Sequence, residues 1–297
     1  MLEILLDTVK DTLRLLPFLF VTYLLMEYLE TKALSSATGV VKKVGRLGPV
    51  FGAALGLVPQ CGFSAAIASL FSGGIVTLGT LIAVFFSTSD EMIPIMISHT
   101  VPAGMLGKIL LLKFLAGLVT GLVIDLVLTA FGKHGKKDFH ELCEQEDCGC
   151  EEGSILKSAL THTFKIWIFI FIVSFVLEIV LDAVGFDAIA GFFAGKPFGT
   201  VILAALVGLI PNCAPSVVLT ECYLSGIFGF GPLMAGLLVN GGMGLLILFR
   251  TNKRLKENIG IAVLMLVLGI LWGLALGNVM KYYPDAGCMF LPGTALA

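Results

Sequence analysis

Two apolar stretches of this chain, at about 48–73 and 199–225, are each interrupted near the middle by nearly the same short pattern. The pattern reads VPQCGFS in the first stretch and IPNCAPS in the second. Proline has no backbone N–H and disrupts the helical turn that precedes it. We therefore expect two duplicated helix–break–helix units, and any fold for this chain has to accommodate both breaks.

The two stretches belong to a longer internal repeat with a constant spacing of 152 residues. The spacing holds over about 70 residues, which indicates duplication, an architecture common in transporters. Gln60 and Asn212 form a conservative pair at this spacing. The identical pairs are Ala53 and Ala205, Gly56 and Gly208, Leu57 and Leu209, Pro59 and Pro211, Cys61 and Cys213, Ser64 and Ser216, Gly74 and Gly226, Gly79 and Gly231, Ala83 and Ala235, Gly117 and Gly269, and Gly121 and Gly273.

The composition places this repeat in a membrane. Hydrophobic residues make up 57% of the chain, charged residues only 13%, and the mean hydropathy is +1.00. Soluble domains carry about 25% charged residues, so this chain lacks the polar residues to cover a water-facing surface. The sequence contains no stripe of basic residues of the kind that binds nucleic acid. The first residues, MLEILLDTVKDTLR, include acidic residues and show no cleavage site, so we expect no secretory signal peptide and expect the first apolar run to be retained as a span.

Other apolar runs are long enough to cross a bilayer, which takes about 20 residues in an α-helix. We expect spans at about 12–30, 75–98, 103–131, 160–184, 227–249 and 257–280. Counting each proline-broken stretch as two further segments makes ten apolar segments.

Positive charge is concentrated in three connections, at 31–47, 132–157 and 250–256, and Lys and Arg mark the cytoplasmic side of membrane proteins. If each broken stretch crossed the membrane once, the first two connections would lie on opposite sides. If each is a re-entrant hairpin, all three lie in the cytoplasm. We therefore expect an all-α polytopic membrane protein with two inverted-topology repeats, each with three transmembrane helices plus a proline-broken re-entrant hairpin.

The domain boundaries follow from this topology. The first transmembrane repeat covers 1–131, with its hairpin at about 48–73. The second covers 158–297, with its hairpin at about 199–225. A cytoplasmic linker at 132–157 joins them.

Inverted repeats bind their substrate near the midplane, where discontinuous helices meet. Backbone that is not helical is tolerated there only where protein buries it or it lines a cavity, which describes the hairpin tips. The alternative is that proline and small residues only shape tight helix packing. The candidate substrate-binding residues of the tips are Pro59, Gln60, Cys61, Ser64, Pro211, Asn212, Cys213 and Ser216, with Glu221 two turns beyond the second tip.

Polar sequence also interrupts the spans that follow each hairpin. Asp90 and Glu91 lie about seven residues, or roughly 10 Å, from the expected outer end, and Asn240 lies in the corresponding break of the second half. Ionisable groups at that depth are costly and usually functional. Lys113 is expected at similar depth, where it either forms a structural salt bridge with Asp90 or Glu91 or leaves one carboxylate free for a cation or proton.

The linker carries His140, Cys143, Cys148 and Cys150 among acidic residues. Thiolates and imidazoles are ligands for soft or borderline metals, and a reducing cytoplasm argues against structural disulfides. The spacing matches no zinc finger. One interpretation is a flexible loop that collects or senses metal, and the other is a solvated acidic linker.

The duplicated [VI]-P-x-C tips, the Cys/His/acidic linker and the ten apolar segments resemble a known family, the ten-segment heavy-metal exporters. This family is distantly similar to arsenical permeases and is often labelled as manganese transporters. The resemblance covers nearly the whole chain. It implies metal efflux, whereas composition and spacing alone imply only transport.

We expect a secondary-type transporter that exports a divalent or heavy metal ion, with manganese as the first choice, because no nucleotide-binding loop is visible. Carboxylates and amides suit Mn²⁺, whereas thiols suit Zn²⁺ or a trivalent arsenical better. The alternative is a permease for trivalent arsenicals or for a small anion drawn to the N-termini of the half-helices.

An enzyme that uses Cys61 or Cys213 as its nucleophile is not expected, because no basic residue near either tip would activate a thiol. We expect a multi-pass protein of the plasma membrane. Its expected partners are the lipid bilayer and a metal ion or small solute, with a homo-oligomer allowed and with neither nucleic acid nor a resident cofactor.

Overall fold

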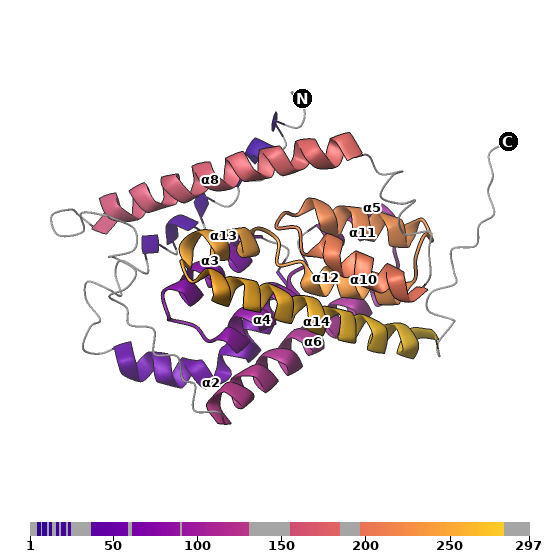
Figure 1. Ribbon diagram of the computed structural model, residues 1–297, viewed down its shortest axis with the longest axis horizontal. Coiled ribbons are helices and arrows are strands. Elements are labelled where there is room, and N and C mark those ends of the chain that lie inside the picture. The colour runs from indigo at the N-terminus through magenta and orange to yellow at the C-terminus, as the bar shows by residue number, and fades with distance from the viewer. Residues whose placement is uncertain are drawn as a thin grey trace.

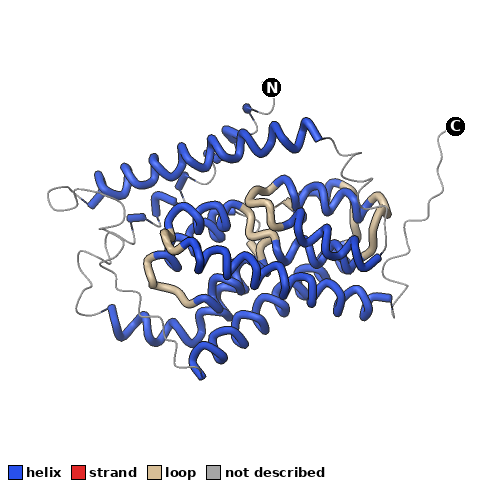
Figure 2. The backbone as a smooth tube through the Cα atoms, in the orientation of Figure 1, coloured by secondary structure: helices blue, strands red, loops and turns tan. Residues whose placement is uncertain are grey.

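The computed structural model describes residues 37–58, 61–89, 91–130, 155–184 and 197–281, together with residues 5–6, 8–10, 12–13, 16–17, 19–21 and 23–24. Within these ranges the backbone consists of helices and loops, and no strand is present (Figure 2). This all-helical architecture, with several strongly apolar helices, fits the expected polytopic membrane protein.

The described helices form two series that follow each other along the chain (Figure 1). The first series consists of α2 (Ala37–Gly56), α3 (Cys61–Ser72), α4 (Leu78–Ser87), α5 (Met92–Ser98) and α6 (Ala103–Ala130). The second series consists of α8 (Ile155–Val184), α10 (Pro197–Gly208), α11 (Ala214–Leu224), α12 (Phe230–Val239), α13 (Met243–Thr251) and α14 (Leu255–Lys281).

The helix bounds of the two series correspond at the 152-residue spacing found in the sequence. α4 and α12 begin and end at equivalent positions, α2 and α10 end at equivalent positions, and α6 and α14 begin at equivalent positions. Gly74 and Gly226 are also equivalent, and both have positive φ angles, 72° and 73°. Each closes the turn that ends a tip helix, where a Cβ would be unfavourable. The duplication is therefore visible in the turns as well as in the helices.

Small residues allow the helices of the first series to approach closely. α2 presents Gly48, Gly52 and Gly56 to α4, and an added Cβ at Gly56 would collide with Ser87 and with the carbonyl oxygen of Val84. Lipid tails are as apolar as the helices themselves, so close packing of small residues is a main source of association between helices in a membrane.

The second series uses the same arrangement at equivalent positions. A Cβ at Gly208 of α10 would collide with the backbone of Gly236 in α12, and one at Gly273 of α14 would collide with Ala235. Each series is thus a three-helix unit, α2–α4–α6 or α10–α12–α14, built around its middle helix.

The two series also interlock. α3 packs on α13 and α11 packs on α5, so each tip helix contacts a short helix of the other series. Ser72 Oγ and Thr251 Oγ1 lie 2.7 Å apart where α3 meets α13. α6 and α14 meet across the series, where Trp272 Nε1 donates a hydrogen bond to Thr120 Oγ1 at 2.9 Å. In Figure 1, α8 lies along one edge of the molecule, α2 and α6 lie toward the opposite edge, and α14 crosses between them.

The helices α4 and α12 form the centre of the molecule, and both stop in mid-span. All residues of α12 are buried, as are Gly79–Ser87 of α4. α4 is separated from α5 by a short break before Met92, and α12 is separated from α13 by Asn240–Gly242. The polar interruptions in the sequence therefore coincide with breaks in the two most buried helices.

Four helical segments of the described part are long and apolar enough to cross a membrane: Leu78–Ser98, Ala103–Ala130, Phe230–Thr251 and Leu255–Asn278. They match the spans expected at 75–98, 103–131, 227–249 and 257–280. The span expected at 160–184 coincides with α8, in which Thr163–Val176 is a shorter apolar segment. Much of the span expected at 12–30 lies outside the described residues.

The structure differs from expectation at the first basic connection. Residues 37–47 of the expected connection at 31–47 are helical and continue without interruption into the first proline-broken stretch as α2. Lys and Arg are good helix formers, so a cluster of positive charge does not by itself end a helix. Both proline-broken stretches are nevertheless helix–break–helix units, as expected.

Candidate functional site

The two tip cysteines meet where the series interlock. The Sγ atoms of Cys61 and Cys213 lie 3.1 Å apart, and both residues carry reduced thiols that are not joined in a disulfide. Cys61 begins α3, and Cys213 immediately precedes α11, so each thiol lies at the N-terminus of a helix. Cys61 is half-buried and Cys213 is buried. The fold thus brings together two equivalent residues that are 152 positions apart in the sequence.

Each tip is held by the same internal hydrogen bond. Ser64 donates from Oγ to the carbonyl oxygen of Cys61 at 2.8 Å, and Ser216 donates from Oγ to the carbonyl oxygen of Cys213 at 2.7 Å. Both serines are buried. Because their protons hold the tips, the two hydroxyl groups have only lone pairs left to offer a solute.

The buried amide of Asn212 gives the second tip a hydrogen-bond donor that has no partner among the described residues. Its side chain is 2% exposed, and its Oδ1 accepts a hydrogen bond from the N–H of Cys213 at 2.6 Å. Its Nδ2 is buried without a hydrogen-bond partner. A buried donor without a partner costs about 1–3 kcal/mol, so this amide is a donor that a bound oxygen atom would satisfy. Pro211 precedes Asn212 and is half-buried. Pro59 and Gln60, which are equivalent to Pro211 and Asn212, lie outside the described residues.

Asn240 shapes the break between α12 and α13. Its Oδ1 accepts a hydrogen bond from the N–H of Gly242 at 3.0 Å, and Gly242 has a φ of 53°. A Cβ added at Gly244 would lie 2.7 Å from the carbonyl oxygen of Ser64 and 2.7 Å from the ring of Phe85. The α12–α13 break is therefore packed directly against the first tip helix, one turn from Cys61.

Hydroxyl groups shape the corresponding break between α4 and α5. Thr88 donates to the carbonyl oxygen of Val84 at 2.7 Å, and Ser87 donates to that of Ala83 at 2.8 Å. Glu91, half-buried, follows at the start of α5. Asp90 lies outside the described residues, so its role as a ligand stays a prediction.

Lys113 is buried between α6 and α12. Its side chain is 1% exposed, and its Nζ donates to the carbonyl oxygen of Leu237, in the last turn of α12, at 3.1 Å. The equivalent residue of the second half is Met265, which is fully buried. The ion pair expected between Lys113 and Asp90 or Glu91 stays a prediction.

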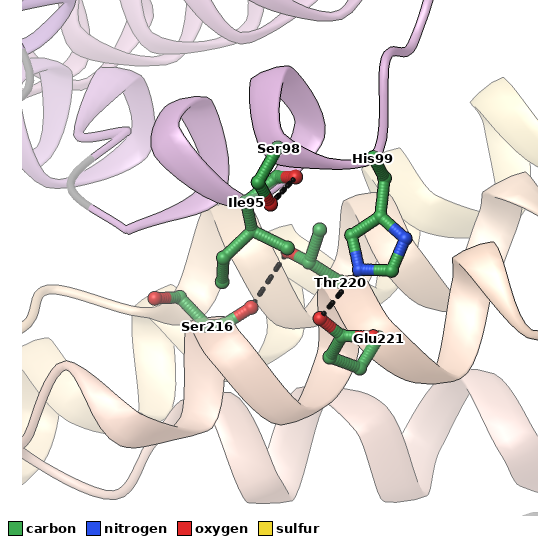
Figure 3. A network of polar contacts seen from close by, with 6 residues as sticks. All are labelled: Ile95, Ser98, His99, Ser216, Thr220 and Glu221. Carbon is green, nitrogen blue, oxygen red and sulfur yellow. Dashed lines mark hydrogen bonds and ion pairs between the residues drawn. The ribbon is translucent and has the colours of Figure 1, made fainter.

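Glu221 lies at a distance from the thiols and contacts a residue that sequence reasoning missed. Its Oε1 is 3.0 Å from Nε2 of His99, which follows α5 (Figure 3). The two side chains are 32% and 47% exposed, so the contact joins α11 to α5 near the surface. The partners are 122 residues apart and not equivalent in the repeat, so no sequence pattern indicated them.

The remaining predicted ligands, His140, Cys143, Cys148 and Cys150, lie outside the described residues. Within the described ranges, no cluster of three or more His, Cys, Asp or Glu side chains could hold a metal ion. Cys61 and Cys213 are therefore the pair of soft ligands that the described fold assembles.

A protein-family model matches residues 1–190 and 126–254, two overlapping segments that together cover most of the chain. The chain belongs to the family described as "Putative, 10TM heavy-metal exporter". Membership of this heavy-metal exporter family confirms the resemblance drawn from the tips, the linker and the number of apolar segments. It identifies a multi-span membrane transporter that works in a lipid bilayer on a metal substrate. A search found no curated protein and no solved structure similar to the chain.

Proposed function

We propose that this exporter moves a thiophilic heavy metal ion, bound between the thiols of Cys61 and Cys213, by a secondary-type mechanism. The observation that carries the proposal is the 3.1 Å separation of two thiol sulfur atoms from equivalent positions. Soft and borderline ions prefer thiolate ligands. In a tetrahedral site with metal–sulfur bonds of about 2.3 Å, two sulfurs lie about 3.8 Å apart, so a small separation of the tips would admit the ion.

The surroundings of the thiols support a charged complex. α3 and α11 both begin at the tips, and helix N-termini stabilise negative charge such as that of thiolates. A dication held by two thiolates is neutral overall, which lowers the cost of burying it. Nδ2 of Asn212 could donate to a water or hydroxyl oxygen that completes the coordination of the ion.

Two contacts between equivalent residues support inverted repeats with a shared site. Cys61 contacts Cys213 and Thr120 contacts Trp272, and each pair is 152 residues apart. A residue touches its own equivalent only near the axis that relates the two repeats. With that axis in the membrane plane, the tips become re-entrant hairpins from opposite faces, and rocking one half against the other exposes the thiols to each side in turn. The basic connections would then face the cytoplasm.

The manganese expectation depends on other ligands. Mn²⁺ prefers carboxylate, carbonyl and water oxygens, and the carboxylates expected to serve it are Glu91 and Asp90. Since the fold assembles thiols at the tips, we rank a thiophilic ion such as Zn²⁺ above Mn²⁺.

A trivalent arsenical is the second candidate substrate. Trivalent arsenic binds sulfur in a pyramidal geometry that holds two sulfurs closer together than a tetrahedral metal does, which suits the short Sγ–Sγ separation. It also keeps a hydroxyl or organic group, and the unpartnered Nδ2 of Asn212 suits a hydroxyl oxygen. A small anion would use only the helix N-termini and would not require the thiols.

Transport into proteoliposomes of purified protein, measured in parallel for Zn²⁺, Mn²⁺, arsenite and phosphate, tests the proposal. We expect Zn²⁺ or arsenite to be carried, and Cys61→Ser and Cys213→Ser each to lower the rate at least about tenfold, since each removes one of two soft ligands. Cys222→Ser is the matched control, because Cys222 is a buried thiol inside α11, nine residues beyond Cys213. A Cys61→Ser/Cys213→Ser protein that transports at the wild-type rate would overturn the proposal. Transport of Mn²⁺ but not of Zn²⁺ or arsenite would indicate that the carboxylates of Asp90 and Glu91, and not the thiols, bind the ion.

A further inference from the structure

Lys113 is a buried cationic side chain that is not among the metal ligands proposed for the thiol site. It lies about ten residues, or about 15 Å, into the 28-residue helix α6 and is 1% exposed. Ionisable side chains at such depth in membrane proteins are costly and mark ion or proton pathways.

The hydrogen bond of Lys113 is made to the end of a broken helix. Its acceptor, the carbonyl oxygen of Leu237, is in the last turn of α12, which ends at Val239. The last carbonyl groups of a helix have no partners within the helix and carry partial negative charge. In transporters, the C-terminal ends of half-helices are places where coupling cations bind. Lys113 places a cation at such an end.

The equivalent helix end shows that a cation is not needed there for structural reasons. At the end of α4, hydroxyl groups of Ser87 and Thr88 donate to the carbonyl oxygens of Ala83 and Val84. The position equivalent to Lys113 is a buried Met265. A neutral donor can therefore serve the end of a broken helix in this fold, so the ammonium group of Lys113 is not needed merely to satisfy the end of α12.

The described helices that pack against α6 are α2, α4 and α12, and α2 carries Lys42, Lys43 and Arg46 in its first half. α4 and α12 contain no ionisable residue. Asp125, on α6 itself, accepts hydrogen bonds from Thr77 Oγ1 and from the N–H of Gly79, and Lys108 of α6 is exposed. The acidic residues of the neighbouring α4–α5 connection are Glu91 and Asp90.

The α12–α13 break links Lys113 to the thiol site. Leu237 is three residues before Asn240, whose side chain forms the break. Gly244, just beyond the break, packs on the carbonyl group of Ser64, and Ser64 holds the first tip through its bond to Cys61. A change at Lys113 would therefore act on the same break that packs against Ser64, the residue that holds the first tip.

We infer that Lys113 is the site at which this exporter binds a coupling proton. When a metal cation enters, the ammonium group of Lys113 loses one proton to water and becomes an amine, because two cations in one low-dielectric interior repel each other. When the metal leaves, the amine takes one proton back. Both forms keep an N–H that can donate to Leu237, so the hydrogen bond survives the exchange. This inference rests on the proposed function and adds the identity of the coupling ion.

The test counts the protons released when Zn²⁺ binds to the purified full-length protein, by calorimetry in two buffers of different ionisation enthalpy. Lys113→Arg keeps the positive charge but cannot release its proton, because arginine stays protonated in proteins. We expect Lys113→Arg to bind Zn²⁺ and to release about one proton fewer than the wild type, while thiol protons are released in both. Lys108→Arg, an exposed lysine of the same helix, should match the wild type.

A second variant and a second measurement keep the test decisive. Lys113→Met reproduces the residue found at the equivalent position and should also release about one proton fewer. In proteoliposomes, an imposed pH gradient should accelerate Zn²⁺ transport by the wild type but not by Lys113→Arg. If the wild type and both variants bind Zn²⁺ and release equal numbers of protons, the proposed role of Lys113 is wrong and the thiol site is unaffected. Failure of the wild type to bind Zn²⁺ would instead contradict the proposed thiol site.

Discussion

Trp272 donates a hydrogen bond from Nε1 to Oγ1 of Thr120 at 2.9 Å, and these two residues occupy equivalent positions 152 residues apart. They lie where α6 and α14, the two long helices of the repeats, contact each other. In the proposed transport cycle this contact is a pivot, because points near the axis between two rocking halves move least.

Trp272→Phe should remove this hydrogen bond and keep most of the aromatic packing. We expect a loss of about 0.6 kcal/mol, the average for hydrogen bonds between helices in membranes, seen as a small fall in thermal stability in detergent. Thr120→Val should have a similar effect, and the double variant should be no worse than either single variant.

Trp167→Phe is the matched control for this substitution. Trp167, on α8, has a buried Nε1 without a hydrogen-bond partner, so its loss removes no hydrogen bond. Equal destabilisation by Trp167→Phe and Trp272→Phe would show that ring packing, not the contact with Thr120, explains the effect.

The 3.1 Å contact between Cys61 and Cys213 predicts rapid disulfide formation by an added azo oxidant such as diamide. Two thiols lose two protons and two electrons to the oxidant as one S–S bond of about 2.05 Å forms. Transport should stop, because the bond joins the halves and uses the ligands, and dithiothreitol should restore it. Mass spectrometry should find the cross-linked peptides in a background with Cys143, Cys148, Cys150 and Cys288 replaced by Ser. Persistence of both free thiols after oxidation would contradict the contact.

Gly244→Ala should disturb the junction between the two halves. The added Cβ would lie 2.7 Å from the carbonyl oxygen of Ser64, which belongs to a helix and cannot yield easily. We expect a cost of about 1–3 kcal/mol and a lower metal affinity, because the displaced helix carries Cys61. Gly260→Ala, where the space around the glycine is open, should be neutral in the same thermal and binding assays.

The contact between His99 and Glu221 predicts a weak latch between α5 and α11. Both side chains are partly exposed, so the pair contributes about 0.2–1 kcal/mol. Glu221→Gln should therefore leave thermal stability nearly unchanged but raise the alkylation rate of the buried Cys222, up to about fivefold. Ser98→Ala is the control, because the Ser98 hydroxyl donates to the carbonyl oxygen of Ile95 within its own helix and not to α11 (Figure 3). An alkylation rate unaffected by Glu221→Gln would exclude the latch.

The linker cysteines lie outside the described part of the chain, and their binding of metal stays a prediction. Replacing Cys143, Cys148 and Cys150 with Ser should lower the number of metal ions bound per protein while leaving the tip site able to bind. Thiol ligation requires deprotonation, so the affinity of the linker should also fall at acid pH. If the triple variant binds the same number of metal ions as the wild type, the linker cysteines do not bind metal and the segment is a solvated acidic linker.

Several features of this protein follow from its sequence alone. The apolar composition determined the membrane class, and the 152-residue spacing identified which residues are equivalent before any coordinates were known. Pro59 and Pro211 predicted the breaks at the tips, because proline acts locally through its own backbone. The polar residues around Asp90 and Asn240 marked interruptions in two apolar runs, and the structure showed that the helices themselves break between α4 and α5 and between α12 and α13. By contrast, the helical start of α2 was missed because charge says little about backbone conformation.

Only the tertiary structure decided which of these residues meet. A constant spacing shows that Cys61 and Cys213 are equivalent, but not how close equivalent residues lie to the axis between the halves, and only there do they touch. The partner of Lys113 is a backbone carbonyl group, which every residue carries and which no sequence pattern marks. The unpartnered amide of Asn212 and the pairing of His99 with Glu221 likewise depend on how two distant helices pack, because side-chain contacts between helices are set by their relative placement and not by local sequence.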